Sequence, residues 1–293
     1  MRKKLLKFLA LSLAFVLCVP TAGAARRGEE MVRVGLAYGS GALVGANLEN
    51  NTGYGYGYRF GYFDEDLRFE ELGETDEKET QITVLKAQNT WFYYDRSSGK
   101  YIYSNSDNGG TVVGCFHLLI DSFRRFDDAA EEAEEYDGGF VAWIDGEYQV
   151  RVGAYLSKED ALDAADELGE GEVVGTSAYA VTVIQTGTDR VLFQFDGGED
   201  LALGIMPDVT GEDEVRTWFQ GYKYHGGFRY ERIGGGDLTV VSVVDMETYI
   251  KGVIPFEMSN DWPLEALKAQ AICARSYAYN NISQNKHSAH HFD

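Results

Sequence analysis

Glu257 is the residue of this sequence that is best placed for acid–base chemistry. It follows Pro255 and is flanked by the apolar residues Phe256 and Met258. Apolar surroundings disfavour a charged carboxylate, which would keep a general acid protonated near neutral pH. The residues alone also allow a solvated loop glutamate or a helix cap, which are more common roles for such a side chain.

Lys268 and Arg275 are candidate substrate-binding residues. They are seven positions apart, so on a helix they would lie on one face. Two cations on one face can contact a polar substrate. From the residues alone, a solvated helix face is the more common role of such charges.

A cluster of histidines, His287, His290 and His291, follows near the end of the sequence. Their spacing could begin a metal site, because imidazole nitrogens are common zinc ligands. No cysteine follows them in this sequence. A solvated chain end is the alternative interpretation of this cluster.

Two helices are expected to position these residues. Asp245 can cap the first helix, because its carboxylate can accept free backbone N–H groups of the first turn. Pro255 is expected to end that helix, which would leave Glu257 in a loop. The second helix is expected to start at Asp261 and Pro263. Its buried stripe would consist of Leu264, Leu267, Ala271, Ala274 and Ala278.

This region resembles the core motif of the SpoIID/LytB family, the stage II sporulation protein D group. The resemblance rests on three segments with unbroken spacing, Tyr249–Met258, Trp262–Ala271 and Ala274–Ala278. It implies a lytic transglycosylase acting on peptide-free cell-wall glycan, with Glu257 as acid/base and with Lys268 and Arg275 as substrate contacts. A hydroxyl of the muramic sugar itself attacks the anomeric carbon in that chemistry. One carboxylate is therefore sufficient, whereas most glycosidases need two.

The resemblance also bears on metal binding. The family continues beyond the position of Asp293 into a segment with cysteine and histidine, and some members bind zinc there. His287 and His290 are then the expected ligands in a longer protein. The sequence is expected to be an incomplete catalytic core, and no cofactor is assigned to it as it stands.

Two other functions are alternatives to the enzyme. The LytB branch implies a non-catalytic partner that enhances a cell-wall amidase. A glycan-binding protein with an inactive catalytic domain is the other. Glu257 is compatible with enzyme ancestry and does not by itself separate these three functions.

An internal repeat occupies the middle of the sequence, where Ala129 and Ala161 are equivalent residues 32 positions apart. Each unit is expected to be a strand, a charged helix and a strand, so that two units form a small antiparallel sheet backed by two helices. Residues 148–155 resemble the opening of a SPOR domain, the sporulation-related repeat, which implies binding to glycan without peptide stems. Gln149 and Tyr155 are then candidate sugar contacts. A plain structural repeat is the alternative.

The first 24 residues are typical of a secretory signal peptide. A basic head precedes the apolar run Phe8–Val19 and the small residues that end at Ala24. The apolar run is short for a membrane span, so we expect cleavage after Ala24 and a protein that is secreted or held at the cell wall. An uncleaved anchor is the alternative. Cys115 and Cys273 would remain, either as one disulfide or with Cys273 as a buried free thiol.

Composition and charge limit the class of protein and its partners. The chain has 293 residues, of which 44% are hydrophobic, and a formal net charge of −21. The hydrophobic fraction is sufficient for folded cores. The negative charge argues against nucleic acid and anionic membranes as partners. It fits solubility outside the cell or an uncharged glycan as ligand. The partners that the family resemblance implies are peptidoglycan glycan strands and cell-wall amidases.

We expect an α+β fold, with a β-rich SpoIID-like domain whose helices carry the active-site loop and a small inserted β-α-β repeat domain. Strands are expected at residues 31–36, 81–85, 91–94, 191–195 and 238–244. The expected boundaries are 1–24 for the signal peptide, 31–105 for an N-terminal β-rich segment, 113–187 for the SPOR-like domain and 190–293 for the incomplete SpoIID-like core.

Overall fold

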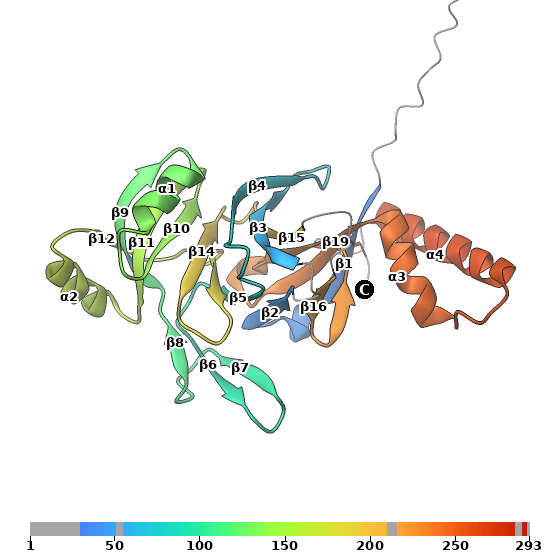
Figure 1. Ribbon diagram of the computed structural model, residues 1–293, viewed down its shortest axis with the longest axis horizontal. Helices are drawn as coiled ribbons and strands as arrows, with labels where there is room; N and C mark the ends of the chain where they lie inside the picture. Colours follow the sequence, from blue (N-terminus) through green and yellow to red (C-terminus); the bar gives the residue numbers. More distant parts are fainter. Residues whose placement is uncertain (1–29, 51–54, 210–215, 285–288, 292–293) are drawn as a thin grey trace, which may run out of the picture. The chain divides into compact units, whose positions relative to one another are not determined.

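The protein is described from a computed structural model, which places residues 30–50, 55–209, 216–284 and 289–291. The expected α+β class is confirmed, because these residues form many strands, four α-helices and two short 3-10 helices, Gly39–Gly41 and Ile233–Gly235 (Figure 1). The expected signal peptide, residues 1–24, lies outside the described residues. Over the ranges placed, no helix has the length and apolar composition that crossing a bilayer requires.

A six-stranded antiparallel sheet has the strand order β1-β19-β18-β15-β3-β4. These strands are β1 (Met31–Ala37), β19 (Thr239–Asp245), β18 (Gly227–Glu231), β15 (Leu203–Val209), β3 (Gly55–Phe63) and β4 (Phe69–Glu74). In β3, which carries many aromatic residues, Tyr58 and Phe60 are each only 1% exposed. Alternate side chains of a strand point to the same face, so these two rings pack into the core.

A ten-stranded sheet has the order β12-β9-β11-β10-β14-β13-β5-β2-β16-β17. The strands outside the repeat are β14 (Val191–Asp196), β13 (Val181–Gln185), β5 (Gln81–Lys86), β2 (Gly45–Glu49), β16 (Thr217–Phe219) and β17 (Tyr222–Tyr224). β10 pairs in parallel with β14, while its other neighbour, β11, is antiparallel to it. The repeat is thus hydrogen-bonded into the same sheet as strands that come before and after it in the sequence.

The repeat itself is built from two strand-helix-strand units. They are β9 (Phe116–Phe123), α1 (Phe126–Ala133) and β10 (Gly139–Ile144), then β11 (Glu147–Tyr155), α2 (Lys158–Leu168) and β12 (Glu172–Val174). Both helices lie on one face of their strands, where Ala129 and Ala161 are fully buried (Figure 1). As expected, two helices back four antiparallel strands, but these strands form one end of the ten-stranded sheet and not a separate small sheet. The strand expected to end the second unit corresponds to β13, but β13 does not pair within the repeat. It pairs with β14 and β5, because the short strand β12 already occupies the edge beside β9.

A three-stranded sheet has the order β7-β6-β8, with β6 (Thr90–Asp95), β7 (Lys100–Ser104) and β8 (Thr111–Val113). Phe92 of β6 packs with Leu85 of β5 and Ile184 of β13, which attaches this sheet to the larger one. The polar segment 104–110 follows β7 and turns into β8 of the same sheet.

The two helices at the end of the described chain are α3 (Met246–Glu257) and α4 (Leu264–Gln284). The Asp245 carboxylate accepts a hydrogen bond from the Thr248 N–H at 2.9 Å, which confirms the expected cap. The prediction that Pro255 ends α3 is wrong. Proline removes only its own N–H donor, and one turn later the Met258 N–H still donates to the Ile254 carbonyl at 2.9 Å.

One face of α3 and α4 packs on β1. The buried side chains of this contact are Val32, Met246, Ile250, Ala274 and Ala278. The expected stripe of α4 is therefore confirmed at Ala274 and Ala278, whereas Leu264 is 65% exposed. Cys273 is exposed and Cys115 is half-buried, and both are free thiols, so neither the disulfide nor the buried Cys273 is found.

Candidate functional site

Glu257 is the last residue of α3 and its side chain is exposed. The apolar neighbours do not enclose it, because Phe256 is 78% exposed and Trp262 is 54% exposed. The structure therefore differs from the expected apolar loop. Apolar neighbours in the sequence enclose a carboxylate only where another element packs over them, and α3 is buried only in its first half, through Met246 and Ile250, while Glu257 lies at its far end.

Tyr249 of α3 lies in the electrostatic environment of both Glu257 and Tyr277. Burial raises the pKa of Tyr249 in α3, and the Tyr277 phenol of α4 and the Glu257 carboxylate raise that pKa further. Charges act this way only over short distances in a partly screened environment. The end of α3 and the middle of α4 thus bring one carboxylate and two phenols into one region.

Both candidate cations form ion pairs on the helices. Arg275 donates from Nη2 to both carboxylate oxygens of Glu247, at 2.6 Å each, which joins α4 to the start of α3. Lys268 donates from Nζ to Glu265 at 2.8 Å within α4. Ion pairs at an exposed surface contribute roughly 0–1 kcal/mol, so a substrate carboxylate can compete for either cation. Their roles as substrate contacts stay predictions.

His290 is buried against β1, at 2% exposure. Its ring centroid is 4.4 Å from that of Tyr38. A side chain at Gly35 would collide with the imidazole, since a β-carbon there would be 2.7 Å from Nδ1. Within the part of the chain that is placed, no three histidine, cysteine, aspartate or glutamate residues are arranged to hold a metal ion. His287, the other expected ligand, lies outside the described residues.

His291 continues this contact with β1. Its backbone N–H donates to the Arg33 carbonyl at 2.8 Å, and the Arg33 N–H donates to the His291 Nδ1 at 3.1 Å. Burial, Arg33 and His290 lower the pKa of His291 to about 4. The imidazole is therefore neutral at physiological pH, and His290 and His291 dock against a strand instead of lying in a solvated tail.

The two candidate sugar contacts of the repeat, Gln149 and Tyr155, are both half-buried on β11. The Gln149 Oε1 accepts hydrogen bonds from Arg151 Nε and Nη2, at 3.0 and 2.6 Å. Tyr155 lies across Gly153, where a β-carbon would be 2.5 Å from its ring. Gln149 therefore belongs to a polar network, while Tyr155 presents only part of its ring to solvent.

That network continues into the sheet as a buried chain of polar side chains. Arg151 donates from Nη1 to Gln194 Oε1 at 2.6 Å, and Gln194 Nε2 lies 3.0 Å from His117 Nε2. The His117 Nδ1 lies 2.6 Å from the Gly153 carbonyl, and a carbonyl can only accept, so Nδ1 carries the proton. This cluster was not predicted from the sequence, although Gln149 and Arg151 at alternate positions of one strand were a signal for it.

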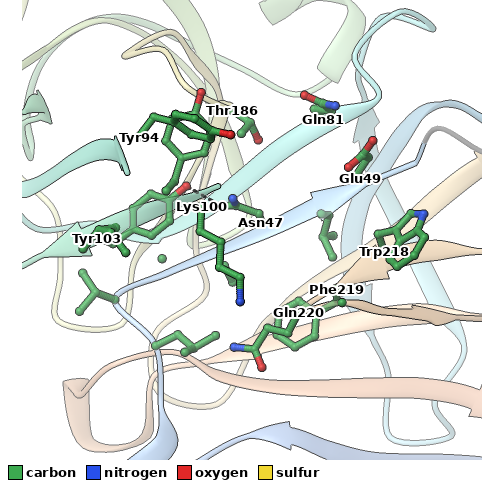
Figure 2. Close-up of a pocket in the computed structure, with 18 of the residues that line it drawn as sticks. Asn47, Glu49, Gln81, Tyr94, Lys100, Tyr103, Thr186, Trp218, Phe219 and Gln220 are labelled. Carbon is green, nitrogen blue, oxygen red and sulfur yellow. Dashed lines mark hydrogen bonds between the residues drawn. The ribbon is translucent and has the colours of Figure 1, made fainter. Parts of the chain in front are cut away.

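A cleft of about 810 Å³ lies elsewhere, over β2 and between the β6–β7 and β16–β17 hairpins. Figure 2 shows its lining of tyrosines, Trp218, amide side chains, Lys100 and Glu49. Local sequence patterns do not reveal this cleft, because its walls come from segments far apart in the chain. It is separate from Glu257, which does not line it.

The fold and this geometry define a strand-rich α+β protein with an exposed glutamate at a helix end. Residues 234–293 match the family model for SpoIID, stage II sporulation protein. This match supports the SpoIID family for the segment that holds Glu257, Lys268 and Arg275. It indicates a protein connected with the cell wall or with sporulation.

A curated relative and the solved structures complete the comparison. An uncharacterized protein of Brachyspira hyodysenteriae (strain ATCC 49526 / WA1) is 48% identical over 78 residues, which are 26% of this chain. The match spans 21% of that relative, so it covers about a fifth of its length. No solved structure matches the chain.

Proposed function

We propose that this protein is a lytic transglycosylase that cleaves peptide-free peptidoglycan strands to 1,6-anhydro products at the cell wall. The observation that carries the proposal is the SpoIID match over residues 234–293, which includes Glu257 and both candidate cations. The exposed position of Glu257 at the end of α3 supports it, because a polymeric substrate needs an acid that it can reach.

Glu257 acts in this proposal as both acid and base. Its protonated carboxyl gives a proton to the glycosidic oxygen while the bond from that oxygen to the anomeric carbon breaks. The C6 hydroxyl of the muramic sugar then attacks the anomeric carbon and gives its proton to the Glu257 carboxylate. The carboxyl ends in its starting state, and no water or second carboxylate takes part.

Lys268 and Arg275 orient the glycan in this proposal. The lactyl carboxylate of muramic acid, left free when the peptide is removed, can replace Glu265 or Glu247 as their partner. The repeat supplies a second, SPOR-like contact with the strand through Gln149 and Tyr155.

The substitution Glu257→Gln tests the chemistry, because it keeps the shape of the side chain and removes the titratable proton. Formation of 1,6-anhydromuramic ends on stripped glycan should fall about 10²–10⁴-fold, as expected for loss of general acid–base catalysis. Mass spectrometry of the digest measures these ends. Glu131→Gln, on the exposed surface of α1, is the matched control and should be as active as the native protein.

A second candidate function is enhancement of a cell-wall amidase without catalysis. The exposed apolar side chains of α4 favour it, since Leu264, Ile272 and Tyr277 are 65%, 63% and 57% exposed and could contact a partner. If the native protein makes no anhydro ends, or if Glu257→Gln makes them equally well, this function replaces the enzyme. Amidase turnover with and without the protein then provides the measurement.

A further inference from the structure

The cleft over β2 has the composition of a ligand site although nothing in the SpoIID region lines it. Its floor is β2 with Asn47, and its walls are the β6–β7 hairpin and the β16–β17 hairpin. In Figure 2, Tyr94 and Trp218 lie on opposite sides, and the side chains of Lys100 and Gln220 extend into the space between them. A volume of about 810 Å³ lies in the usual range of roughly 300–1,000 Å³ for small-molecule sites.

Two aromatic side chains of the walls are exposed to the cleft without being needed for the core. Tyr94 is 52% exposed and Trp218 is 37% exposed. Tyr94 is held by an edge contact with Tyr101, with 5.2 Å between ring centroids. Lys223 Nζ lies 4.7 Å from the centre of the Trp218 ring. These contacts fix the rings as platforms at low entropic cost to a ligand.

Polar groups with unused hydrogen-bonding capacity lie between these platforms. The Asn47 Oδ1 accepts hydrogen bonds from the hydroxyls of Tyr103 and Thr83, which fixes the amide. Among the described residues, the Asn47 amide N–H₂ has no acceptor, and the side chains of Lys100 and Gln220 make no hydrogen bond or ion pair. Amide and ammonium donors in an aromatic cleft suit a ligand that is rich in acceptors.

We infer that this cleft binds a saccharide chain that carries a carboxylate, which extends the proposed function by a glycan-binding site remote from Glu257. A pyranose ring offers flat C–H faces to aromatic platforms and a rim of hydroxyl and acetamido groups to amide side chains. Lys100 pairs with the single carboxylate of such a sugar. The charged side chains that line the cleft are Lys100 and Glu49, so the lining has no excess of positive charge and suits a saccharide with one carboxylate per disaccharide better than a polyanion.

Calorimetric titration of the folded chain with two tetrasaccharides tests this inference. One is chitotetraose, which is neutral, and the other alternates N-acetylglucosamine with N-acetylmuramic acid and has no peptide. Tyr94→Ala and Trp218→Ala should each weaken both probes on the order of tenfold, because each removes a stacking platform. Lys100→Gln should weaken the muramic probe alone. Binding of the muramic probe is measured in the Glu257→Gln background, where it is not cleaved.

Tyr93→Ala is the matched control. Tyr93 precedes Tyr94 on β6 and is 43% exposed, but neighbouring side chains of a strand point to opposite faces, and Tyr93 does not line the cleft. The Tyr93→Ala variant should bind both tetrasaccharides with the affinity of the native protein. Thermal unfolding of each variant establishes that the fold is retained.

The inference is overturned if the native protein binds neither probe, or if Tyr94→Ala and Trp218→Ala bind both as the native protein does. The proposed catalytic role of Glu257 is tested by a different result from the one that tests the saccharide site. If the cleft variants lose affinity while Glu257→Gln still makes anhydro ends, the saccharide site stands and the role of Glu257 does not. If anhydro ends depend on Glu257 while the cleft variants bind normally, the reverse holds.

Discussion

His117 illustrates at the residue scale how burial sets the charge of a single side chain. Burial lowers its pKa to about 4, against the opposing effect of the Gly153 carbonyl, and Arg151 lowers it further. With Nδ1 donating to Gly153, the neutral Nε2 accepts from Gln194. A proton on Nε2 would place two donors against each other in a site that water does not reach.

Protonation of His117 should therefore destabilise the fold. Its folded pKa of about 4 lies below the ordinary 6.5, so its stabilising contribution is present above pH 6.5 and is lost as pH falls from 6.5 towards 4. The loss should reach about 3 kcal/mol for this residue. Urea unfolding between pH 7 and pH 4 measures it.

His117→Asn, which can still donate to Gly153, is the comparison that isolates this residue. His291 titrates in the same window, so the native protein alone cannot assign the effect. The variant should be less stable at pH 7 and should lose less stability on acidification. An identical pH dependence in the two proteins would assign the effect to His291 and the carboxylates.

At the scale of elements, the sequence predicted correctly those features that depend on residues close together in the chain. In the second unit of the repeat, the first strand and the helix were predicted well, because the strand alternates and because Ser157 and Asp160 form a capping box at the start of α2, whereas the last strand was not. Pro255 was interpreted wrongly, because a proline near a helix C-terminus removes only one hydrogen bond. The exposure of Glu257 depends on which elements pack over α3, and no local pattern reports that.

Asp245 provides a quantitative test of one element. Asp245→Ala removes the acceptor of the Thr248 N–H and should lower the free energy of unfolding by about 1 kcal/mol. Asp245→Asn retains an oxygen at the same place and should lose much less. Chemical denaturation of the three proteins gives the comparison, and equal losses for alanine and asparagine would show that charge, not capping, is what Asp245 contributes.

For the whole molecule, the sequence predicted the α+β class and the SpoIID segment, but not the way the strands combine. The cleft is formed by residues as distant as Asn47, Lys100 and Trp218, which only the ten-stranded sheet and its hairpins bring together. Hydrophobic periodicity describes one element at a time, so it cannot predict pairing between remote strands. The candidate catalytic residue came from a motif, and the candidate saccharide cleft came from the fold.

Export is a property of the whole chain that the sequence predicts directly. If residues 1–24 are a cleaved signal peptide, N-terminal sequencing of the exported protein should begin at Ala25. Replacing the apolar residue Leu11 by arginine should retain the protein in the cell, because the apolar run would be interrupted. Recovery of Met1 on exported protein would indicate an uncleaved anchor.

The parallel pairing of β10 with β14 has a consequence for how this protein can be engineered or rearranged in evolution. A domain joined only through its two chain ends can be deleted or transplanted as a cassette. Here, removing residues 113–187 would leave β14 without β10 on one side and without β13 on the other. Unpaired strand edges template aggregation, so the shortened chain should precipitate instead of retaining the remaining sheet. The repeat is a fixed part of the scaffold, and its sequence can diverge more easily than it can be lost.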